Sequence, residues 1–389
     1  MNIQRIGIIF IILLVLAFLY TRFFGPLESL QTLYTQPPVT STQLSEDVSY
    51  TIQSVATNLK VPWSVVFTSK TRALISERSG SIRVLENDVL SPTPLHTFSN
   101  VSSKSEEGLM GLAVDPNYET TKYIYACYAT MDGSTMSDKV VRLTDEGTRF
   151  TNETVILAGI PAAVNHAGCR LRFGPDQKLY ITTGEATQKN IAQDRNSLGG
   201  KILRINADGS IPQDNPFPNS PVFSLGHRNP QGIDWHPLTN QLWETEHGPS
   251  GNDGPGGGDE VNKIEAGKNY GWPIVSHQKS APEFVSPSLV FTPAIAPASG
   301  MFYRGSVYPQ WKNNFLFGML RGTGIMRVQF DDQGEKIVSN AKIDNIDVGR
   351  VREIVESPDG ILYFTTSNQD GRGRARPQDD QLFKIIVTQ

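Results

Sequence analysis

The tract from Phe223 to Pro273 carries more polar chemistry than a structural pair of strands needs. Within it, the segment GHRNPQG places Arg228 beside Asn229, close to an acidic, glycine-rich loop. Arg228 offers a planar fork of donors to the oxygens of a ligand, and Asn229 offers both a donor and an acceptor. The structural alternative is a turn stabilised by the Asn-Pro pair, with a surface arginine. We expect a functional site in this tract.

Asn165 and His166 come directly before the segment CRLRF, within the sequence AAVNHAG. Because the neighbours of His166 are small, apolar bulk does not wall in its imidazole. A histidine titrates near neutral pH and can take a proton from a substrate hydroxyl. His166 is therefore a candidate general base. A histidine that caps backbone groups of a loop is the competing interpretation.

The loop EHGPSGNDGPGGGDE, which ends at Glu260, combines a flexible backbone with the carboxylates of Asp253, Asp259 and Glu260. Hard cations such as calcium bind carboxylates and backbone carbonyls, and glycine lets carbonyls turn inward. The loop is therefore a candidate calcium site. Its spacing does not match an EF-hand, so an acidic surface loop without metal is the alternative.

Three arginines add positive charge further along the chain. The segment GRVRE places Arg350 and Arg352 two residues apart, on one face of a predicted strand. Arg321 lies in the segment MLRGTG. If the three converge on one channel, they suit a ligand with several carboxylates. Arginines that lie along a sheet edge in water are the commoner arrangement.

These residues are embedded in a repeated strand pattern. Apolar strands, turns built on Pro, Asp, Asn or Gly, and second strands of β-branched and aromatic residues recur through the chain. The second strands are ALISE, YIYACY, LYITTGE, QLWETEH, FLFGML and LYFTTS. Their spacing of about 46 to 74 residues, with no long helical periodicity, indicates radially repeated four-stranded units.

The pattern therefore predicts an all-β fold, a six-bladed β-propeller of four-stranded antiparallel sheets. We expect the segment SYTIQSVA, from Ser49, to pair into the last blade and close the ring. The polar residues fall at junctions between blades, over the central channel. A β-sandwich with long insertions is the alternative fold.

The first 24 residues contain one early cation, Arg5, and an apolar run from Ile6 to Tyr20. This layout predicts a signal peptide or an uncleaved membrane anchor over residues 1–24. Residues 25–47 are rich in Thr, Ser, Gln and Pro, and we interpret them as a linker. Residues 48–389 form the predicted propeller. The domain is expected to be exported, secreted or tethered to the outer face of the membrane.

Composition excludes several classes of protein. The net charge of −4 and the pI of about 5.9 give no basic footprint for nucleic acid. No Rossmann, P-loop, G-x-S-x-G or H-E-x-x-H signature is present. Cys127 and Cys169 both lie in predicted strands, and they form either one disulfide or two buried thiols.

The chain resembles the soluble pyrroloquinoline quinone-dependent glucose and aldose sugar dehydrogenases, which are six-bladed propellers. The likeness runs from about Leu59 to Ile385. The segments that carry it include LKVPWSVVF, GLMGLAVDPNY, NHAGCRLRFG, GHRNPQG, TNQLWETEHGP, GGDEVNKIEAGKNYGWP, PAIAPASGMFYRG and GRVREIVESPDG. The order and number of these segments are specific for the family.

The resemblance implies oxidation of an aldose sugar at its anomeric hydroxyl to a lactone, with hydride passing to the quinone and electrons to an external acceptor. By motif, His166 matches the general base, and Arg228 matches the residue that stabilises charge on the quinone. Further contacts to the quinone are implied for five residues: Asn229, Arg321, Arg350, Arg352 and Glu106.

The resemblance also implies two calcium sites. Gly248 and Pro249 match residues whose backbone carbonyls hold the calcium beside the quinone. Glu260 and Tyr270 fall where some relatives bind a second, structural calcium.

Three features depart from the family pattern. Glu106 or Glu107 stands where relatives place a glutamine against the cofactor, and an anionic cofactor would repel a carboxylate there. Arg321 replaces a common lysine, which changes the donor geometry. The segment SGNDGPGG lengthens the loop after the calcium carbonyls.

Two other functions fit parts of the pattern. One is a non-catalytic calcium-binding propeller that binds carbohydrate or protein. Such a binding module has no need of a base facing an oxyanion stabiliser, so the presence of His166 together with Arg228 and Asn229 favours an enzyme. A calcium-dependent lactone hydrolase would need a cage of carboxylates and Asn around its metal. The sequence therefore favours the sugar dehydrogenase.

Overall fold

A computed structural model describes residues 49–388, and the structural statements that follow concern this part of the chain. The predicted signal peptide or anchor and the whole of the predicted linker lie outside the described residues. Within residues 49–388, no helix is long and apolar enough to cross a membrane.

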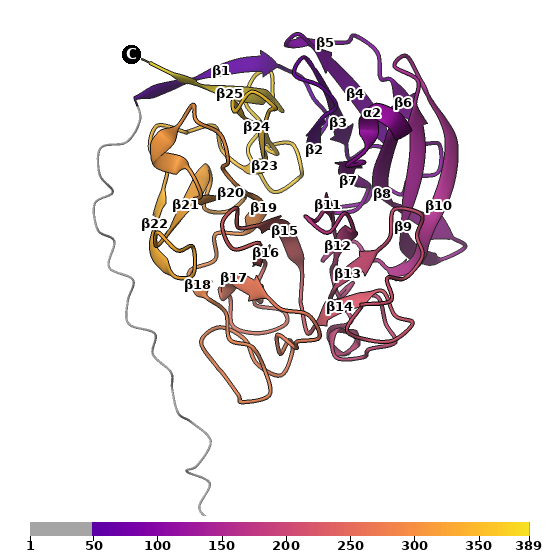
Figure 1. Cartoon of the computed structure of the whole chain (residues 1–389), viewed down its shortest axis with the longest axis vertical. Helices are drawn as coiled ribbons and strands as arrows, with labels where there is room; N and C mark the ends of the chain where they lie inside the picture. Colours follow the sequence, from indigo (N-terminus) through magenta and orange to yellow (C-terminus); the bar gives the residue numbers. More distant parts are fainter. Residues whose placement is uncertain (1–48, 389) are drawn as a thin grey trace, which may run out of the picture. The chain divides into compact units, whose positions relative to one another are not determined.

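Six antiparallel sheets stand around a common centre, as Figure 1 shows. Blade 1 consists of β2 (Pro62–Phe67), β3 (Arg72–Glu77), β4 (Ser81–Glu86) and β5 (Val89–Leu90), with β6 (His96–Thr97) also paired to β4. Blade 2 consists of β7 (Leu109–Val114), β8 (Tyr123–Asp132), β9 (Thr135–Asp145) and β10 (Phe150–Pro161). Blade 3 consists of β11 (Gly168–Phe173), β12 (Leu179–Thr183), β13 (Lys201–Ile205) and β14 (Val222–Leu225). Blade 4 consists of β15 (Pro230–Trp235), β16 (Leu242–Glu246), β17 (Asp259–Ile264) and β18 (Leu289–Phe291). Blade 5 consists of β19 (Pro297–Phe302), β20 (Phe315–Met319), β21 (Ile325–Phe330) and β22 (Ile337–Lys342). Blade 6 consists of β23 (Val351–Glu356), β24 (Leu362–Thr366), β25 (Leu382–Val387) and β1 (Tyr50–Ala56).

The first strand of each blade faces the centre. These inner strands contact one another in the order β2, β7, β11, β15, β19 and β23, and β23 returns to β2. Each of the six predicted second strands is found as the next strand of its blade. The prediction of a six-bladed propeller is confirmed, and the β-sandwich alternative is wrong.

Burial on both faces explains the apolar composition of the middle strands. In β12 all five residues are buried, because blades 2 and 4 cover both faces of blade 3. Leu179 and Ile181 pair in register with Ile205 and Leu203 of β13. These side chains pack with Tyr125 of blade 2, so one core cluster joins two neighbouring blades.

The ring closes through strands from the two ends of the described chain. The segment from Tyr50 to Ala56 forms β1, which pairs antiparallel with β25 and becomes the outer strand of blade 6. Figure 1 shows this strand beside the C-terminal one. The prediction that SYTIQSVA completes the last blade is confirmed.

Helical structure is sparse between residues 49 and 388. It comprises the single turn α2 (Tyr118–Thr121) and the short 3₁₀ segments η1 (Lys189–Ala192) and η2 (Pro309–Trp311). The expectation that the propeller has no long helix is confirmed for these residues.

The two cysteines form a disulfide between blades. Cys127 of β8 is bonded to Cys169 of β11, and both side chains are fully buried. This settles the choice that the sequence left open between a disulfide and two free thiols. The bond ties blade 2 to the segment that leads from His166 into blade 3.

Candidate functional site

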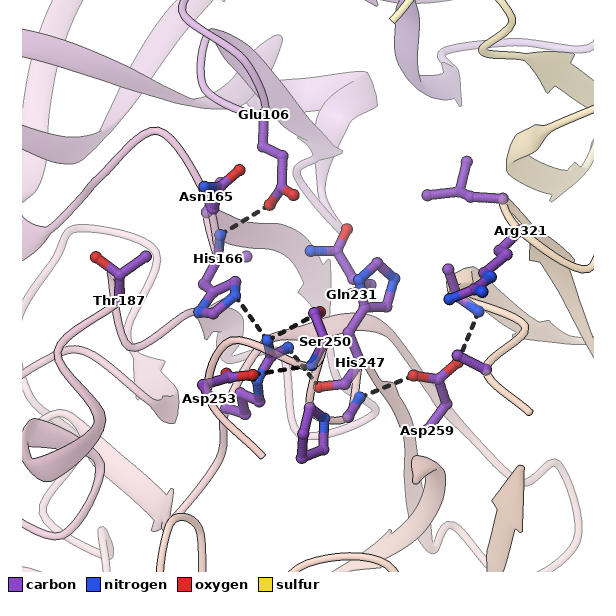
Figure 2. A pocket seen from close by; sticks show the side chains of 18 of the residues that line it. Glu106, Asn165, His166, Thr187, Gln231, His247, Ser250, Asp253, Asp259 and Arg321 are labelled. Carbon is purple, nitrogen blue, oxygen red and sulfur yellow. Dashed lines mark hydrogen bonds and ion pairs between the residues drawn. The ribbon is translucent and has the colours of Figure 1, made fainter. Parts of the chain in front are cut away.

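A polar cavity of about 700 Å³ opens at one end of the central channel. Loops from several blades line it, as expected for residues at blade junctions, and Figure 2 shows many of them. The cavity brings together eleven of the residues that the sequence singled out: Glu106, Asn165, His166, Arg228, Gly248, Pro249, Asp253, Asp259, Arg321, Arg350 and Arg352.

His166 stands at the entrance to β11 in a left-handed conformation, with φ of 60°. Its Nδ1 lies 2.6 Å from Oε1 of the buried Glu185, and its Nε2 lies 2.8 Å from Nη2 of Arg228. Because arginine can only donate, Nε2 is the acceptor there, and Nδ1 carries the proton that Glu185 accepts. The imidazole is therefore held as the tautomer whose Nε2 can take a proton from a ligand in the cavity.

The same pairing recurs one blade further along. Nδ1 of His227 lies 2.9 Å from Oε2 of Glu246, and the sequence separation of 19 residues equals that of His166 and Glu185. This second pair is fully buried, and Oε1 of Glu246 accepts the backbone N–H of Arg228 at 2.5 Å. One His–Glu pair thus faces the cavity, and the next one fixes the loop that carries Arg228.

Arg228 is 2% exposed, and all three of its guanidinium nitrogens are engaged. Its Nε donates to Oδ2 of Asp253 at 2.7 Å, and Nη1 donates to the carbonyl of His247 at 3.1 Å. Nη2 reaches both His166 and the hydroxyl of Ser250, the latter at 3.2 Å. The predicted acidic loop therefore folds against the arginine, and Asp253 neutralises its charge.

Asn229 is buried and, unlike the other predicted quinone contacts, is not among the residues that line the cavity. Its Oδ1 accepts the backbone N–H of Gly168 at 3.1 Å and Nε2 of Gln231 at 2.9 Å. Its buried Nδ2 has no hydrogen-bond partner among the described residues. A buried donor without a partner costs free energy, so this amide is suited to an oxygen supplied by a ligand.

The three predicted arginines all line the cavity, but they differ in their burial and in their hydrogen-bond partners. Arg352 is buried, and its Nη1 donates to Oε1 of Gln231 at 3.0 Å. Burial lowers the pKa of Arg352 to about 10, which leaves the guanidinium charged at neutral pH. Arg350 precedes β23 instead of lying within it, so the prediction that both arginines share one face of a strand is wrong. Its Nη2 pairs with Asp370 at 2.7 Å. Arg321 is exposed, on the side of the cavity away from His166 in Figure 2.

Backbone carbonyls crowd around Gly248. A Cβ at this position would lie 2.2 Å from the carbonyl oxygen of Gly258 and 2.4 Å from that of Gly257, so only glycine fits. The N–H of Gly248 donates to Oδ1 of Asp259 at 2.8 Å. Asp259 also accepts the N–H groups of Ile295 and Ala296, which fixes its position. This set of oxygens is the kind that a hard cation prefers.

Glu260 and Tyr270 lie apart from the cavity, next to the second His–Glu pair. The Tyr270 ring stacks on His227, with centroids 4.7 Å apart. The Glu260 carboxylate accepts Nδ2 of Asn262 at 3.0 Å, and burial together with the charge of Glu246 raises its pKa well above the ordinary range. A metal at these residues would thus occupy a second location, separate from Gly248 and Pro249.

Of the two glutamates before β7, only Glu106 lines the cavity. Its Oε2 accepts the backbone N–H of His166 at 2.8 Å, and its Oε1 is ion-paired with Arg372. Burial alone would raise the pKa of Glu106, but Arg372 together with His247 and His166 outweighs burial and keeps that pKa below its ordinary value. Glu107 is fully buried and points elsewhere, accepting the N–H of Ala163 at 3.2 Å.

Sequence reasoning missed several residues that matter here. Glu185 could have been found, because it follows His166 by the same interval at which Glu246 follows His227. Arg372 gave no such signal, since it lies in an irregular loop 266 residues from Glu106. Three further lining residues were not singled out: Trp63, Lys189 and His247.

Residues 59–376 match the model of the Glucose / Sorbosone dehydrogenase family. The chain belongs to this family of sugar dehydrogenase propellers. It is 30% identical to the aldose sugar dehydrogenase YliI of Escherichia coli, over 82% of this chain and 91% of that protein.

Two solved structures extend the comparison. A putative oxidoreductase (glucose dehydrogenase) from a Thermus species is 38% identical, with a TM-score of 0.80 over 87% of this chain and 100% of the other. The pyrroloquinoline quinone-bound aldose sugar dehydrogenase of Streptomyces coelicolor is 31% identical, with a TM-score of 0.77 over 88% of this chain and 99% of the other. The resemblance noted in the sequence is confirmed.

Proposed function

We propose that this protein is an exported quinoprotein that oxidises aldose sugars at the anomeric hydroxyl to lactones. Pyrroloquinoline quinone with calcium would serve as cofactor, and an external acceptor would take the electrons. The observation that carries the proposal is the arrangement of His166 between Glu185 and Arg228 in the wall of an open cavity.

The donor set suits an anionic quinone. Arg350, Arg352 and Arg321 all line the cavity and supply positive charge for carboxylates. Arg228 and the unpartnered Nδ2 of Asn229 supply donors for quinone oxygens. The carbonyls of Gly248 and Pro249 would hold calcium, a role supported by the resemblance and by the place of both residues in the cavity wall.

Bound in this cavity, pyrroloquinoline quinone would supply an acceptor for the hydride of the anomeric carbon, and calcium would supply Lewis-acid polarisation of that acceptor. The protein's own part is the removal of the hydroxyl proton. Nε2 of His166 takes this proton, so the C–O single bond of the sugar becomes the C=O of the lactone. Glu185, 2.6 Å from Nδ1, keeps the imidazole in the required tautomer and stabilises the imidazolium that forms.

The Cys127–Cys169 disulfide supports export, because disulfides persist in oxidising compartments such as the periplasm. The apolar run near the N-terminus points the same way, as a signal peptide or an anchor. Glu260 and Tyr270 remain proposed ligands of a second, structural calcium.

The test is direct. Purified protein is mixed with calcium and pyrroloquinoline quinone, and cofactor absorbance and sugar-dependent reduction of a dye are followed. We expect tight binding of the quinone and oxidation of several aldoses. A protein that binds calcium, but neither binds the quinone nor reduces the dye when sugar is added, would instead be the non-catalytic calcium-binding propeller.

A further inference from the structure

Glu106 does more than line the cavity, because it holds the backbone of the candidate base. Its carboxylate accepts the N–H of His166 at 2.8 Å, and its own N–H donates to the carbonyl of Val164 at 3.1 Å. Figure 2 shows Glu106 above His166, joined to it by the first of these contacts. His166 has a left-handed backbone, a conformation that is unfavourable for a residue other than glycine. Such a conformation persists only where neighbouring groups fix it.

Arg372 reaches this point from blade 6. It lies in the loop between β24 and β25, whereas Glu106 precedes blade 2 and Asn165 precedes blade 3. Its Nη1 binds Oε1 of Glu106, and its Nη2 donates to Oδ1 of Asn165 at 2.7 Å. Asp370, which pairs with Arg350, accepts the backbone N–H of Arg372 at 2.9 Å. One guanidinium thus spans two segments that hold His166.

This contact also answers the electrostatic objection to a carboxylate in the site. The Glu106 side chain is 16% exposed and faces a cavity suited to an anionic ligand. An unpaired carboxylate there would repel that ligand. The charge of Arg372 balances Glu106, so the pair presents no net charge to the cavity.

We propose that Arg372 is a positioning residue for His166, acting through Glu106 and Asn165, and that it also makes Glu106 compatible with an anionic cofactor. The second half of this inference rests on the proposed function, and the first half does not. Neither half requires Arg372 to touch the cofactor.

The first experiment uses the full-length protein without cofactor and measures hydrogen–deuterium exchange at the His166 amide. Arg372→Gln and Glu106→Ala should each speed exchange at this amide by about tenfold or more, because a charge-assisted hydrogen bond is lost or loosened. Glu106→Gln should keep the amide protected, since its side-chain carbonyl still accepts the N–H. The matched control is Arg374→Gln, because Arg374 is exposed on the same loop and has no ion pair among residues 49–388.

The second experiment measures binding of pyrroloquinoline quinone in the presence of calcium. Arg372→Gln should weaken binding by about tenfold or more, and adding Glu106→Gln to that variant should restore it, because the unpaired carboxylate is then gone. Arg372→Lys separates the two roles. It should preserve quinone binding, since the positive charge remains. It should leave the His166 amide less protected, since a single ammonium group lacks the planar fork of donors with which Arg372 contacts both Glu106 and Asn165.

Each outcome decides a stated point. Unchanged exchange at His166 in both Arg372→Gln and Glu106→Ala would overturn the positioning role. Failure of Glu106→Gln to rescue quinone binding in the Arg372→Gln background would show that Arg372 contacts the cofactor directly, which overturns the second half. If the parent protein binds no quinone, the proposed function fails, while the exchange experiment still judges the positioning role.

Discussion

Nδ1 of His166 faces Oε1 of Glu185 at 2.6 Å, and the carboxylate of Glu185 is fully buried. This relationship decides which nitrogen of the imidazole carries the lone pair that can accept a proton. With Nδ1 donating to Glu185, the lone pair of Nε2 points to the cavity side occupied by Arg228. A loop histidine that merely caps backbone groups has no need of such a partner.

Replacement of His166 by Gln should lower the turnover number by about 10²-fold or more, the usual contribution of a positioned base. Binding of quinone and calcium should stay close to the parent level, because His166 is not a proposed ligand of either. Steady-state kinetics with saturating cofactor and a quinone titration check both parts. A His166→Gln enzyme with parental turnover would remove the base assignment.

Replacement of Glu185 by Gln tests the tautomer separately. The amide can offer a donor to Nδ1, which would leave Nε2 protonated and unable to act as a base. We expect turnover to fall by about tenfold or more, with little change in quinone affinity. Equal kinetics in the variant and the parent would mean that Glu185 does not set the state of His166.

Gly248→Ala should abolish the calcium-dependent binding of the quinone, because it disturbs the proposed calcium site beside the quinone. The added Cβ would lie 2.2 Å from the carbonyl oxygen of Gly258, so the backbone oxygens must move apart. The parent should gain thermal stability on addition of calcium, because a ligand that binds only the native state stabilises it by mass action. Gly256→Ala is the matched control, since a Cβ there meets nothing within 4 Å. Calcium-dependent quinone binding that survives in Gly248→Ala would place the calcium beside the quinone elsewhere, whereas stabilisation by the second calcium at Glu260 and Tyr270 is expected to remain.

Stability should fall on the acid side partly through His236. Burial, followed by the nearby Arg304, lowers the pKa of His236 below its ordinary 6.5, and its Nε2 is buried without a partner among the described residues. Below about pH 6.5 the unfolded chain binds a proton that the folded protein does not, so the free energy of unfolding falls with pH.

His236→Gln removes this contribution. Between pH 7.5 and 5.5 the parent should lose more free energy of unfolding than the variant, as measured by urea unfolding at both values. Identical losses in the two proteins would show that His236 takes up its proton as readily when folded as when unfolded.

Loss of the disulfide should weaken both the fold and the site. Cys127 and Cys169 close a loop with a sequence separation of 42 residues. The double variant Cys127→Ala with Cys169→Ala should therefore lose about 2 to 4 kcal/mol of unfolding free energy. Because Cys169 follows His166 closely and also has a positive φ of 65°, we expect turnover to fall as well. Mass spectrometry with and without reductant verifies the bond in the parent.

The strands could be predicted from sequence because each blade repeats one local pattern. Leu179 and Ile181, for example, predict β12, because these apolar residues stand at alternate positions directly after a turn. The residues of the site were harder. Gly248 and Arg228 lie in motifs, whereas the contact between Arg372 and Glu106 joins positions 266 residues apart and depends on the closed ring. Arg350 was misplaced into β23 because strand ends are set by pairing, which a single sequence does not reveal.

The pairing of β1 with β25 makes blade 6 the one sheet that cannot form from a continuous stretch of chain. Blades 1 to 5 each use consecutive strands, whereas Tyr50 must find Val387. The entropic cost of closing so long a loop arises in this single step. We therefore expect the ring to close last during folding. The N–H of Thr388 already donates to the carbonyl of Ser49 at 2.8 Å. A circular permutant that joins these two residues, with new ends in a loop between other blades, would turn β25 and β1 into a hairpin and should fold faster than the natural order.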